Sequence, residues 1–190
     1  GGAARQGDAP DIEVEVPATV AAARAAIAGL PAERPVAIVP LFEPPTRVHH
    51  AHLVGVAIAS EGQRPLYLGF CGVGAALGDA ATGLLRELLA DPARPKFVHD
   101  VKQLEIVCSR HGLTIAGPIV DTMIASFLVD PAKCIPHTLD QVAREYVQRS
   151  IPAAKSLLGS GQSARSPGAR RRWWNWRTRQ PSAAAGSKGC

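Results

Sequence analysis

Short apolar runs with the spacing of β-strands dominate the first third of the chain. Residues 12–16 alternate strictly between apolar and acidic side chains, the period-two pattern of a half-buried strand. Residues 36–39 are continuously apolar, which predicts a buried central strand. Residues 53–59 and 66–70 are the next strand candidates, joined by a hairpin-like turn at Glu61-Gly62. We therefore expect residues 36–39 to lie at the centre of a sheet, flanked by these two later strands.

Helical patterns alternate with short strands in the rest of the chain. The predicted helices begin at Thr19, Asp79, Asp100, Asp121 and Thr138 and end near Ala28, Leu89, Gly112, Val129 and Tyr146. Each starting side chain can accept a hydrogen bond from the free backbone N–H groups of the first turn, and Thr138 with Gln141 has the spacing of a capping box. Short strands are predicted at 96–99 and 115–120. This order predicts an α/β fold with a mixed sheet flanked by helices.

The composition changes abruptly after Gly159. Residues 1–159 hold 14 Lys and Arg against 16 Asp and Glu, whereas residues 160–190 hold seven basic residues, no acidic residue and all three tryptophans. Because no apolar stripe runs through this segment, it cannot bury enough surface to offset its chain entropy. We expect a linker at 1–10, a folded domain at 11–158 that is incomplete at its C-terminal end, and a disordered basic tail at 159–190.

Basic and aromatic side chains are interleaved in this tail. The residues concerned are Arg170, Arg171, Arg172, Trp173, Trp174, Trp176 and Arg177. Such a segment suits single-stranded nucleic acid, through phosphate neutralisation and base stacking. Out-of-frame translation of a GC-rich gene gives the same composition, and the abruptness of the change favours that explanation. We expect weak DNA binding carried by these residues, with Lys102 as an additional cation.

Composition also limits location and metal chemistry. No run of 18 apolar residues occurs, so no membrane span is expected, and the absence of a signal-like N-terminus predicts a cytoplasmic protein. The four cysteines form no C-x-x-C pair, which fits reduced thiols. His49, His50 and His52 have no nearby cysteine and no evident fourth ligand, so a zinc site is not predicted there.

The second half contains three distinctive segments, at residues 96–104, 121–131 and 137–146, and together they resemble the 3′–5′ proofreading exonuclease domain of bacterial family A DNA polymerases. Residues 96–104, Lys-Phe-Val-His-Asp-Val-Lys-Gln-Leu, resemble its second exonuclease motif. Residues 121–131, Asp-Thr-Met-Ile-Ala-Ser-Phe-Leu-Val-Asp-Pro, and residues 137–146, beginning His-Thr-Leu-Asp-Gln, resemble the two helices that follow. The resemblance implies a ribonuclease H-like fold with a five-stranded mixed sheet. It also implies a polymerase module as partner if the chain is part of a longer protein.

The resemblance further implies a two-metal nuclease site, and this sequence departs from it. Active relatives hold Mg²⁺ or Mn²⁺ with several carboxylates, because hard cations need oxygen ligands. Alignment on Leu53-Val54-Gly55 places Pro40 and Phe42 where the first motif has its Asp and Glu, and Leu104 where the second has its Asp. No acidic residue follows Tyr146 for the third motif. We therefore expect no metal, no cofactor and no catalytic residue.

Three carboxylates near these positions are weaker candidates for an altered site. They are Glu43, Asp100 and Asp121. Glu43 is reached only by a one-residue slip, which would turn its side chain to the other face of a strand. Asp100 and Asp121 each stand directly before a helix, where capping explains them. An active exonuclease that uses these three residues stays open as an alternative, as does a non-catalytic interaction domain.

Overall fold

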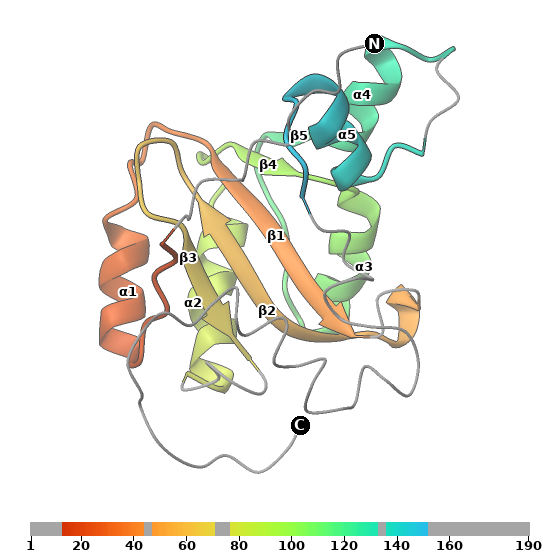
Figure 1. Ribbon diagram of the computed structural model, residues 1–190. Helices are drawn as coiled ribbons and strands as arrows, with labels where there is room; N and C mark the ends of the chain where they lie inside the picture. The colour runs from red at the N-terminus through yellow and green to blue at the C-terminus, as the bar shows by residue number, and fades with distance from the viewer. Residues whose placement is uncertain (1–12, 44–46, 71–76, 133–135, 152–190) are drawn as a thin grey trace, which may run out of the picture.

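The computed structural model describes residues 13–43, 47–70, 77–132 and 136–151. They form one mixed five-stranded sheet with the strand order β3-β2-β1-β4-β5 (Figure 1). The strands are β1 (Val36–Glu43), β2 (His52–Ala59), β3 (Leu66–Gly69), β4 (Lys96–Val98) and β5 (Ile119–Asp121). The helices are α1 (Val20–Ala28), α2 (Asp79–Ala90), α3 (Val101–Arg110), α4 (Thr122–Val129) and α5 (Leu139–Tyr146), with a short 3₁₀ turn, η1 (Val48–His50). The mixed α/β architecture predicted from the sequence is confirmed.

The central position predicted for residues 36–39 is also confirmed. β1 pairs antiparallel with β2 on one side and parallel with β4 on the other, and β4 pairs parallel with β5. Contrary to the prediction, the strand at residues 66–69 does not flank β1, because β3 pairs with β2 and forms the sheet edge. A chain that turns back through the short hairpin at Glu61-Gly62 pairs with the strand it has just left, which leaves the other side of β1 open to β4.

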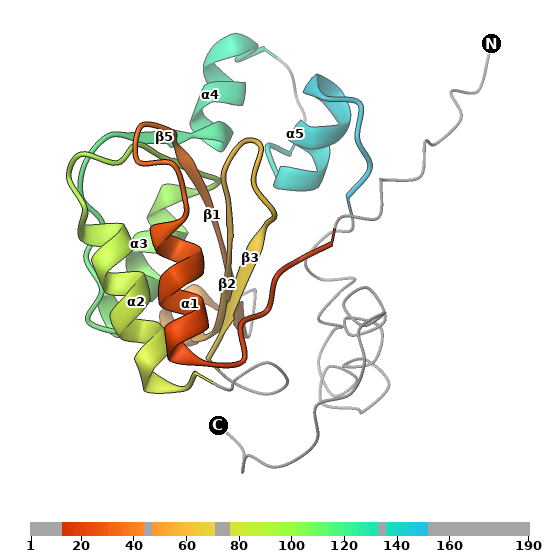
Figure 2. The ribbon, with the colours of Figure 1, turned by 90° about the vertical axis from the view of Figure 1, so that its left-hand side faces the viewer.

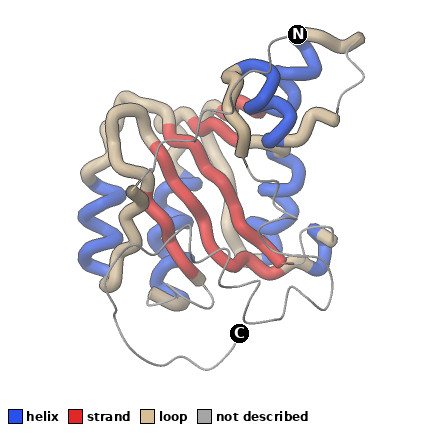
Figure 3. The backbone as a smooth tube through the Cα atoms, viewed as in Figure 1, coloured by secondary structure: helices blue, strands red, loops and turns tan. Residues whose placement is uncertain are grey.

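The core lies between the sheet and the helices α1, α2 and α3, which cover the same face of the sheet (Figure 2). Alternate residues of β1, Val36 and Ile38, point to this face and are buried, as are the four leucines predicted to form the stripe of α2. The tube view shows that α4 and α5 lie together at one end of the sheet (Figure 3). Within the described residues, no helix is long and apolar enough to cross a membrane.

Most helix starts follow the predicted capping chemistry. Thr19 accepts a hydrogen bond from the N–H of Ala22 at 3.1 Å, and Asp100 and Asp121 cap α3 and α4 in the same way. Gly112 follows α3 with φ +64°, a left-handed conformation that favours glycine. Local polar chemistry therefore fixes where these helices begin and end.

Three local predictions are wrong. The described part of residues 12–16 forms a single bridge, Glu15 to Leu66, because only Glu15 exchanges backbone hydrogen bonds with the β3 segment. Asp79 is the first residue of α2, and Gly78 holds the capping position. Thr138 precedes α5 as predicted, but its side chain makes no capping hydrogen bond, so the capping box with Gln141 does not form. A spacing pattern shows that a cap is possible, whereas the side-chain rotamer decides whether it forms.

Lys96 is an unexpected core residue. Its side chain is completely buried at the start of β4, and its Nζ donates hydrogen bonds to the carbonyl oxygens of Asp91, Arg94 and Ala116 at 2.7 to 2.8 Å. Burial lowers the pKa of Lys96, and the nearby Asp91 carboxylate opposes that shift. Because three carbonyls use all three ammonium protons, Lys96 ties the loop after α2 to the loop before β5.

Candidate functional site

The most densely bonded polar side chain in the described structure is Asp121, at the C-terminal end of β5. Asp121 is buried, with 8% exposure, and its carboxylate accepts four backbone hydrogen bonds. The donors are the N–H groups of Asp100 (3.1 Å), Val101 (2.7 Å), Met123 (2.8 Å) and Ile124 (3.4 Å). Asp121 thus joins the first turn of α3 to the first turn of α4.

This geometry also sets the charge state of Asp121. Burial alone would raise its pKa, but the four backbone N–H groups stabilise the anion and hold the pKa below its ordinary value. The positive ends of two helices face the same carboxylate. Asp121 is therefore an ionised structural anion that satisfies helix-end donors.

Asp100 lies beside Asp121 and has a capping role of its own. Its backbone is left-handed, with φ 61° and ψ 71°, and its Oδ1 accepts a hydrogen bond from the N–H of Gln103 at 3.1 Å. The amide of the Gln103 side chain donates to the other carboxylate oxygen. Both oxygens of Asp100 are thus directed to Gln103, within the first turn of α3.

Sequence reasoning missed two hydrogen-bonded pairs of polar side chains, His99 with Thr122 and Ser126 with His137. The hydroxyl of Thr122 donates to the carbonyl of Val98 at 3.1 Å and so accepts from Nδ1 of His99 at 2.9 Å. The hydroxyl of Ser126 donates to the carbonyl of Met123 at 2.7 Å and lies 2.8 Å from Nδ1 of His137. Burial lowers the pKa of His99, against the opposing effect of the Asp121 carboxylate. The only signal for these pairs was position: His99 ends the predicted strand 96–99, and Thr122 stands at the start of the helix predicted after residues 115–120.

The three positions at which the family resemblance predicts metal ligands are apolar, and two of them pack in or against the core. Leu104 is a core residue of α3 with 1% exposure. Phe42 packs against the same core from β1, just beyond an irregularity in the pairing of β1 with β2 between Leu41 and Phe42. Pro40 pairs with Val56 of β2, while the β1–β4 pairing involves only Val36 and Ala37, so Pro40 interrupts no described β1–β4 ladder. Leu104 and Phe42 therefore direct hydrocarbon toward the core.

The remaining candidates are dispersed. Glu43 is exposed at the end of β1, opposite His52 of β2, and Lys102 is exposed on α3. His49 and His50 lie in η1 with exposed side chains. Across the described residues, no three His, Cys, Asp or Glu side chains are grouped so as to hold a metal ion. The tail residues from Arg170 to Arg177 lie outside the described residues.

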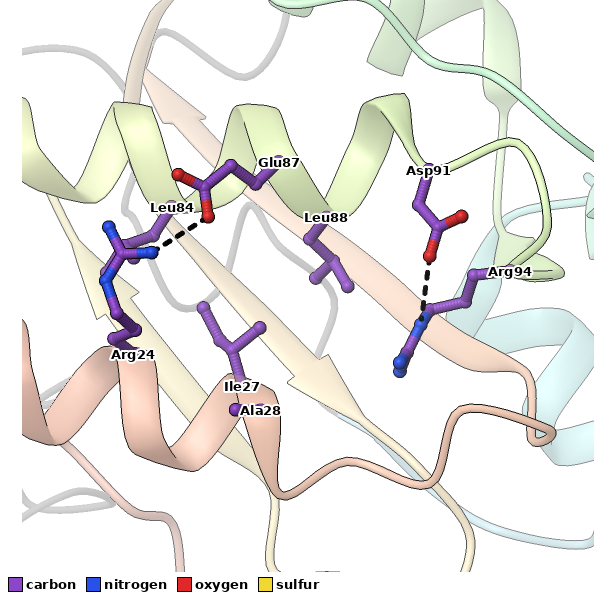
Figure 4. Close-up of a pocket in the computed structure, with 8 residues that line it drawn as sticks. All are labelled: Arg24, Ile27, Ala28, Leu84, Glu87, Leu88, Asp91 and Arg94. Carbon is purple, nitrogen blue, oxygen red and sulfur yellow. Dashed lines mark hydrogen bonds and ion pairs between the residues drawn. The ribbon is translucent and has the colours of Figure 1, made fainter.

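A hollow of about 240 Å³ lies between α1 and α2 and includes none of the predicted site residues. Arg24 pairs with Glu87 at 3.1 Å across one end of it, and Arg94 lies 3.8 Å from Asp91 at the other (Figure 4). Since each cation already faces a carboxylate, the hollow has no excess charge to attract an ionic ligand. It is a gap between two packed helices.

The mixed sheet, with its helices and the paired starts of α3 and α4, defines a ribonuclease H-like fold. The family model for the DNA polymerase I, ribonuclease H-like domain matches residues 44–180, and the chain belongs to this family. The match shows that the resemblance found in residues 96–146 reflects family membership. It also continues beyond the last described residue.

Individual relatives agree with this assignment. DNA polymerase I of Mycobacterium tuberculosis is 37% identical over 65 residues, 34% of this chain and 7% of that protein. DNA polymerase I of Synechocystis is 30% identical over 101 residues, 50% of this chain and 10% of that protein. The crystal structure of Trypanosoma brucei RNase D has a TM-score of 0.63 at 12% identity, covering 87% of this chain and 59% of that one, a likeness in fold alone. The chain spans only 7% and 10% of these two polymerases.

Proposed function

We propose that this chain is a catalytically inactive 3′–5′ exonuclease domain of DNA polymerase I type that binds nucleic acid weakly through its basic C-terminal segment. The proposal rests on the apolar residues that stand where the family's carboxylates are expected. The family chemistry needs several of them to converge on two cations, whereas Leu104 and Phe42 fill that part of the domain with hydrocarbon.

The donor set does not fit Mg²⁺ or Mn²⁺. These cations need several oxygen ligands, and removing water from them is costly unless the ligands carry charge. The carboxylate of Asp121 already accepts four backbone hydrogen bonds, and that of Asp100 is held by Gln103. Glu43 stands exposed on another element, at the end of β1. Recruiting Asp121 to a metal would leave the starts of two helices unsatisfied, so these residues support no metal-dependent step.

The nucleic-acid part of the proposal rests on charge placement. Residues 1–159 carry 14 basic and 16 acidic residues and so offer no net field to attract a polyanion. Residues 160–190 carry seven basic residues and no acidic one, together with all three tryptophans. Counterion release from phosphates and stacking on the indoles would give sequence-independent binding of single strands.

Metal titration tests the proposal in the full-length chain. We expect calorimetry with Mn²⁺ to detect no site tighter than about millimolar, since the described residues lack a converging set of hard ligands. The matched comparison is the Glu43→Gln chain, which removes a carboxylate without disturbing a helix start. A tighter site that disappears in Glu43→Gln would instead establish the altered active site formed by Glu43, Asp100 and Asp121.

A further inference from the structure

Two side chains tie the C-terminal end of α3 to the segment that leads into β2. Arg110, the last residue of α3, donates a hydrogen bond from its guanidinium group to the carbonyl oxygen of His49 in η1. His111, the next residue, accepts a hydrogen bond at its ring Nε2 from the backbone N–H of Leu53, at 3.2 Å. η1 thus packs beside this end of α3 (Figure 1). We name residues 47–53 the docked segment.

The direction of the second hydrogen bond fixes the charge of His111. A backbone N–H can only donate, so Nε2 of the ring must supply a lone pair. The ring is therefore neutral and carries its proton on Nδ1. Protonation would place an N–H at Nε2 as well, and two donors would then face each other across the contact between α3 and β2. This contact requires an uncharged His111.

The surroundings of His111 oppose its protonation. Burial is the largest cause that lowers the pKa of His111, and the charges of His52 in β2 and of Arg110 lower it further. Further basic side chains come from the docked segment and from α2, which bonds to the carbonyl of Gly112: Arg47, His49, His50 and Arg86. Glu43 of β1 lies opposite His52 in the ladder, but it is exposed, so solvent screens its charge. A protonated His111 would therefore join a cluster of cations.

An irregularity in the sheet makes the start of β2 depend on this contact. The pairing of β1 with β2 shifts register between Leu41 and Phe42, so that Val54 is an extra residue of β2 and the ladder is locally disrupted. On the other side of β2, the pairing with β3 involves residues 55–58, beyond the docked segment. The hydrogen bond that Leu53 donates to the end of α3 therefore holds β2 where β3 no longer pairs with it.

We infer that a pH-sensitive contact holds the docked segment: it lies against α3 while His111 is neutral and opens when His111 is protonated. The opening is local, because the buried leucines of α2 and the buried residues of the sheet hold the rest of the core together without His111. This conformational change goes beyond the proposed function, because neither DNA nor a metal ion takes part in it.

Proton linkage sets the size of the effect. The closed form lowers the pKa of His111 below 6.5, and opening exposes the ring and returns its pKa to about that value. The contact is therefore fully stabilising above about pH 6.5 and is weakened as the pH falls below it. At pH 5.5, one unit lower, protonation favours the open form by up to about tenfold relative to pH 7.5.

Amide hydrogen exchange followed by NMR in the full chain tests the inference. His50, Ala51 and Leu53 each donate a backbone hydrogen bond within the docked segment or to His111. We expect the protection factors of these three amides to fall by up to about tenfold from pH 7.5 to pH 5.5. They should stay below those of core amides, such as that of Leu85, at both pH values, because the segment opens without global unfolding.

Two variants and one titration assign the effect to His111. His111→Gln should abolish the pH dependence, because the side-chain oxygen of glutamine can accept from the N–H of Leu53 at either pH. His50→Gln is the matched control, since it removes an exposed histidine of the same segment, and it should leave the pH dependence unchanged. In the unaltered chain, the His111 ring should titrate below pH 6.5 and carry its proton on Nδ1 at pH 7.5.

Three results would overturn the inference. The first is protection of the docked segment that is the same at both pH values, or that depends on pH equally in a folded His111→Gln chain. The second is protection equal to that of the core, which would mean that the segment opens only by global unfolding. The third is a His111 ring that titrates above pH 6.5 or carries its neutral proton on Nε2. If His111→Gln fails to fold, the ring titration of the unaltered chain still decides.

Discussion

Replacing Asp121 by alanine should destabilise the domain far more than the loss of an ordinary surface carboxylate. The substitution leaves four backbone N–H groups at the starts of α3 and α4 without their acceptor, at a site with 8% exposure. Losing a helix cap costs about 1 kcal/mol, and each buried donor left unsatisfied costs about 1–3 kcal/mol. Because water and backbone relaxation recover part of this, we expect a total loss of about 3–4 kcal/mol.

Asp121→Asn separates charge from hydrogen bonding. The asparagine oxygen can replace Oδ1, which accepts from Asp100, Met123 and Ile124, but its NH₂ group cannot accept the 2.7 Å bond from Val101. We expect about half the loss of the alanine variant, roughly 2 kcal/mol. The folded-state pKa of Asp121 lies below the ordinary value of 3.8. The charge-dependent stabilisation is therefore complete above about that pH and is lost as the pH falls through the lower folded-state pKa.

Urea unfolding followed by circular dichroism measures both effects. Asp79→Ala is the matched control, because Asp79 is exposed in the first turn of α2 and caps no helix in the structure. It should cost about 0.3–1 kcal/mol through the helix dipole alone. A loss below about 1 kcal/mol in Asp121→Ala, with an unchanged m-value, would show that Asp121 is not a structural anion. The four backbone hydrogen bonds would then contribute little to stability.

Three further results are expected. Leu104→Ala should cost about 3 kcal/mol in urea unfolding, because Leu104 is a core residue with 1% exposure, and a loss near zero would remove it from the core. Burial lowers the pKa of His99 and His111, so the unfolded chain binds more protons than the folded chain below about pH 6.5, and the free energy of unfolding should fall from pH 7 to pH 5. His99→Gln and His111→Gln should each reduce part of that pH dependence. An unchanged pH dependence in both variants would contradict the pKa shifts. A chain ending at Leu158 should lose nearly all affinity for single-stranded DNA. In the full chain, each phosphate contact removed by an Arg→Gln substitution in the tail should reduce the slope of log binding constant against log salt concentration by about 0.7. Equal binding by the shortened and full chains would place the DNA surface in residues 1–158.

Sequence patterns predicted the elements of this fold well because local chemistry determines them. The continuous apolar run at 36–39 predicted the central strand, and Asp100 and Asp121 predicted two helix starts. Pairing is a property of the whole sheet, so the position of β3 at the edge was not readable from its own residues. The bridge at Glu15 shows the same limit, since alternation permits a strand but does not supply a long partner.

The site was predictable only in part. The family resemblance predicts that Pro40, Phe42 and Leu104 stand at ligand positions, which stays a prediction, and the structure adds that Phe42 and Leu104 pack in or against the core. The capping of two helices by Asp121 was not readable, because two of its four donors, the N–H groups of Asp100 and Val101, belong to a segment 20 or more residues away. The buried Lys96 also gave no signal, since its three carbonyl partners come from two separate loops.

The proposed absence of nuclease activity is tested by incubating the full chain with a 3′-labelled single-stranded oligonucleotide. The assay includes Mg²⁺ or Mn²⁺ and a parallel reaction with EDTA, and the Asp121→Asn chain serves as a check on any activity observed. Because the described residues group no metal-binding set of side chains, we predict that the label stays intact with either metal. The contradicting result is metal-dependent trimming from the 3′ end that EDTA stops and that is absent in a folded Asp121→Asn chain. That result would establish an active exonuclease.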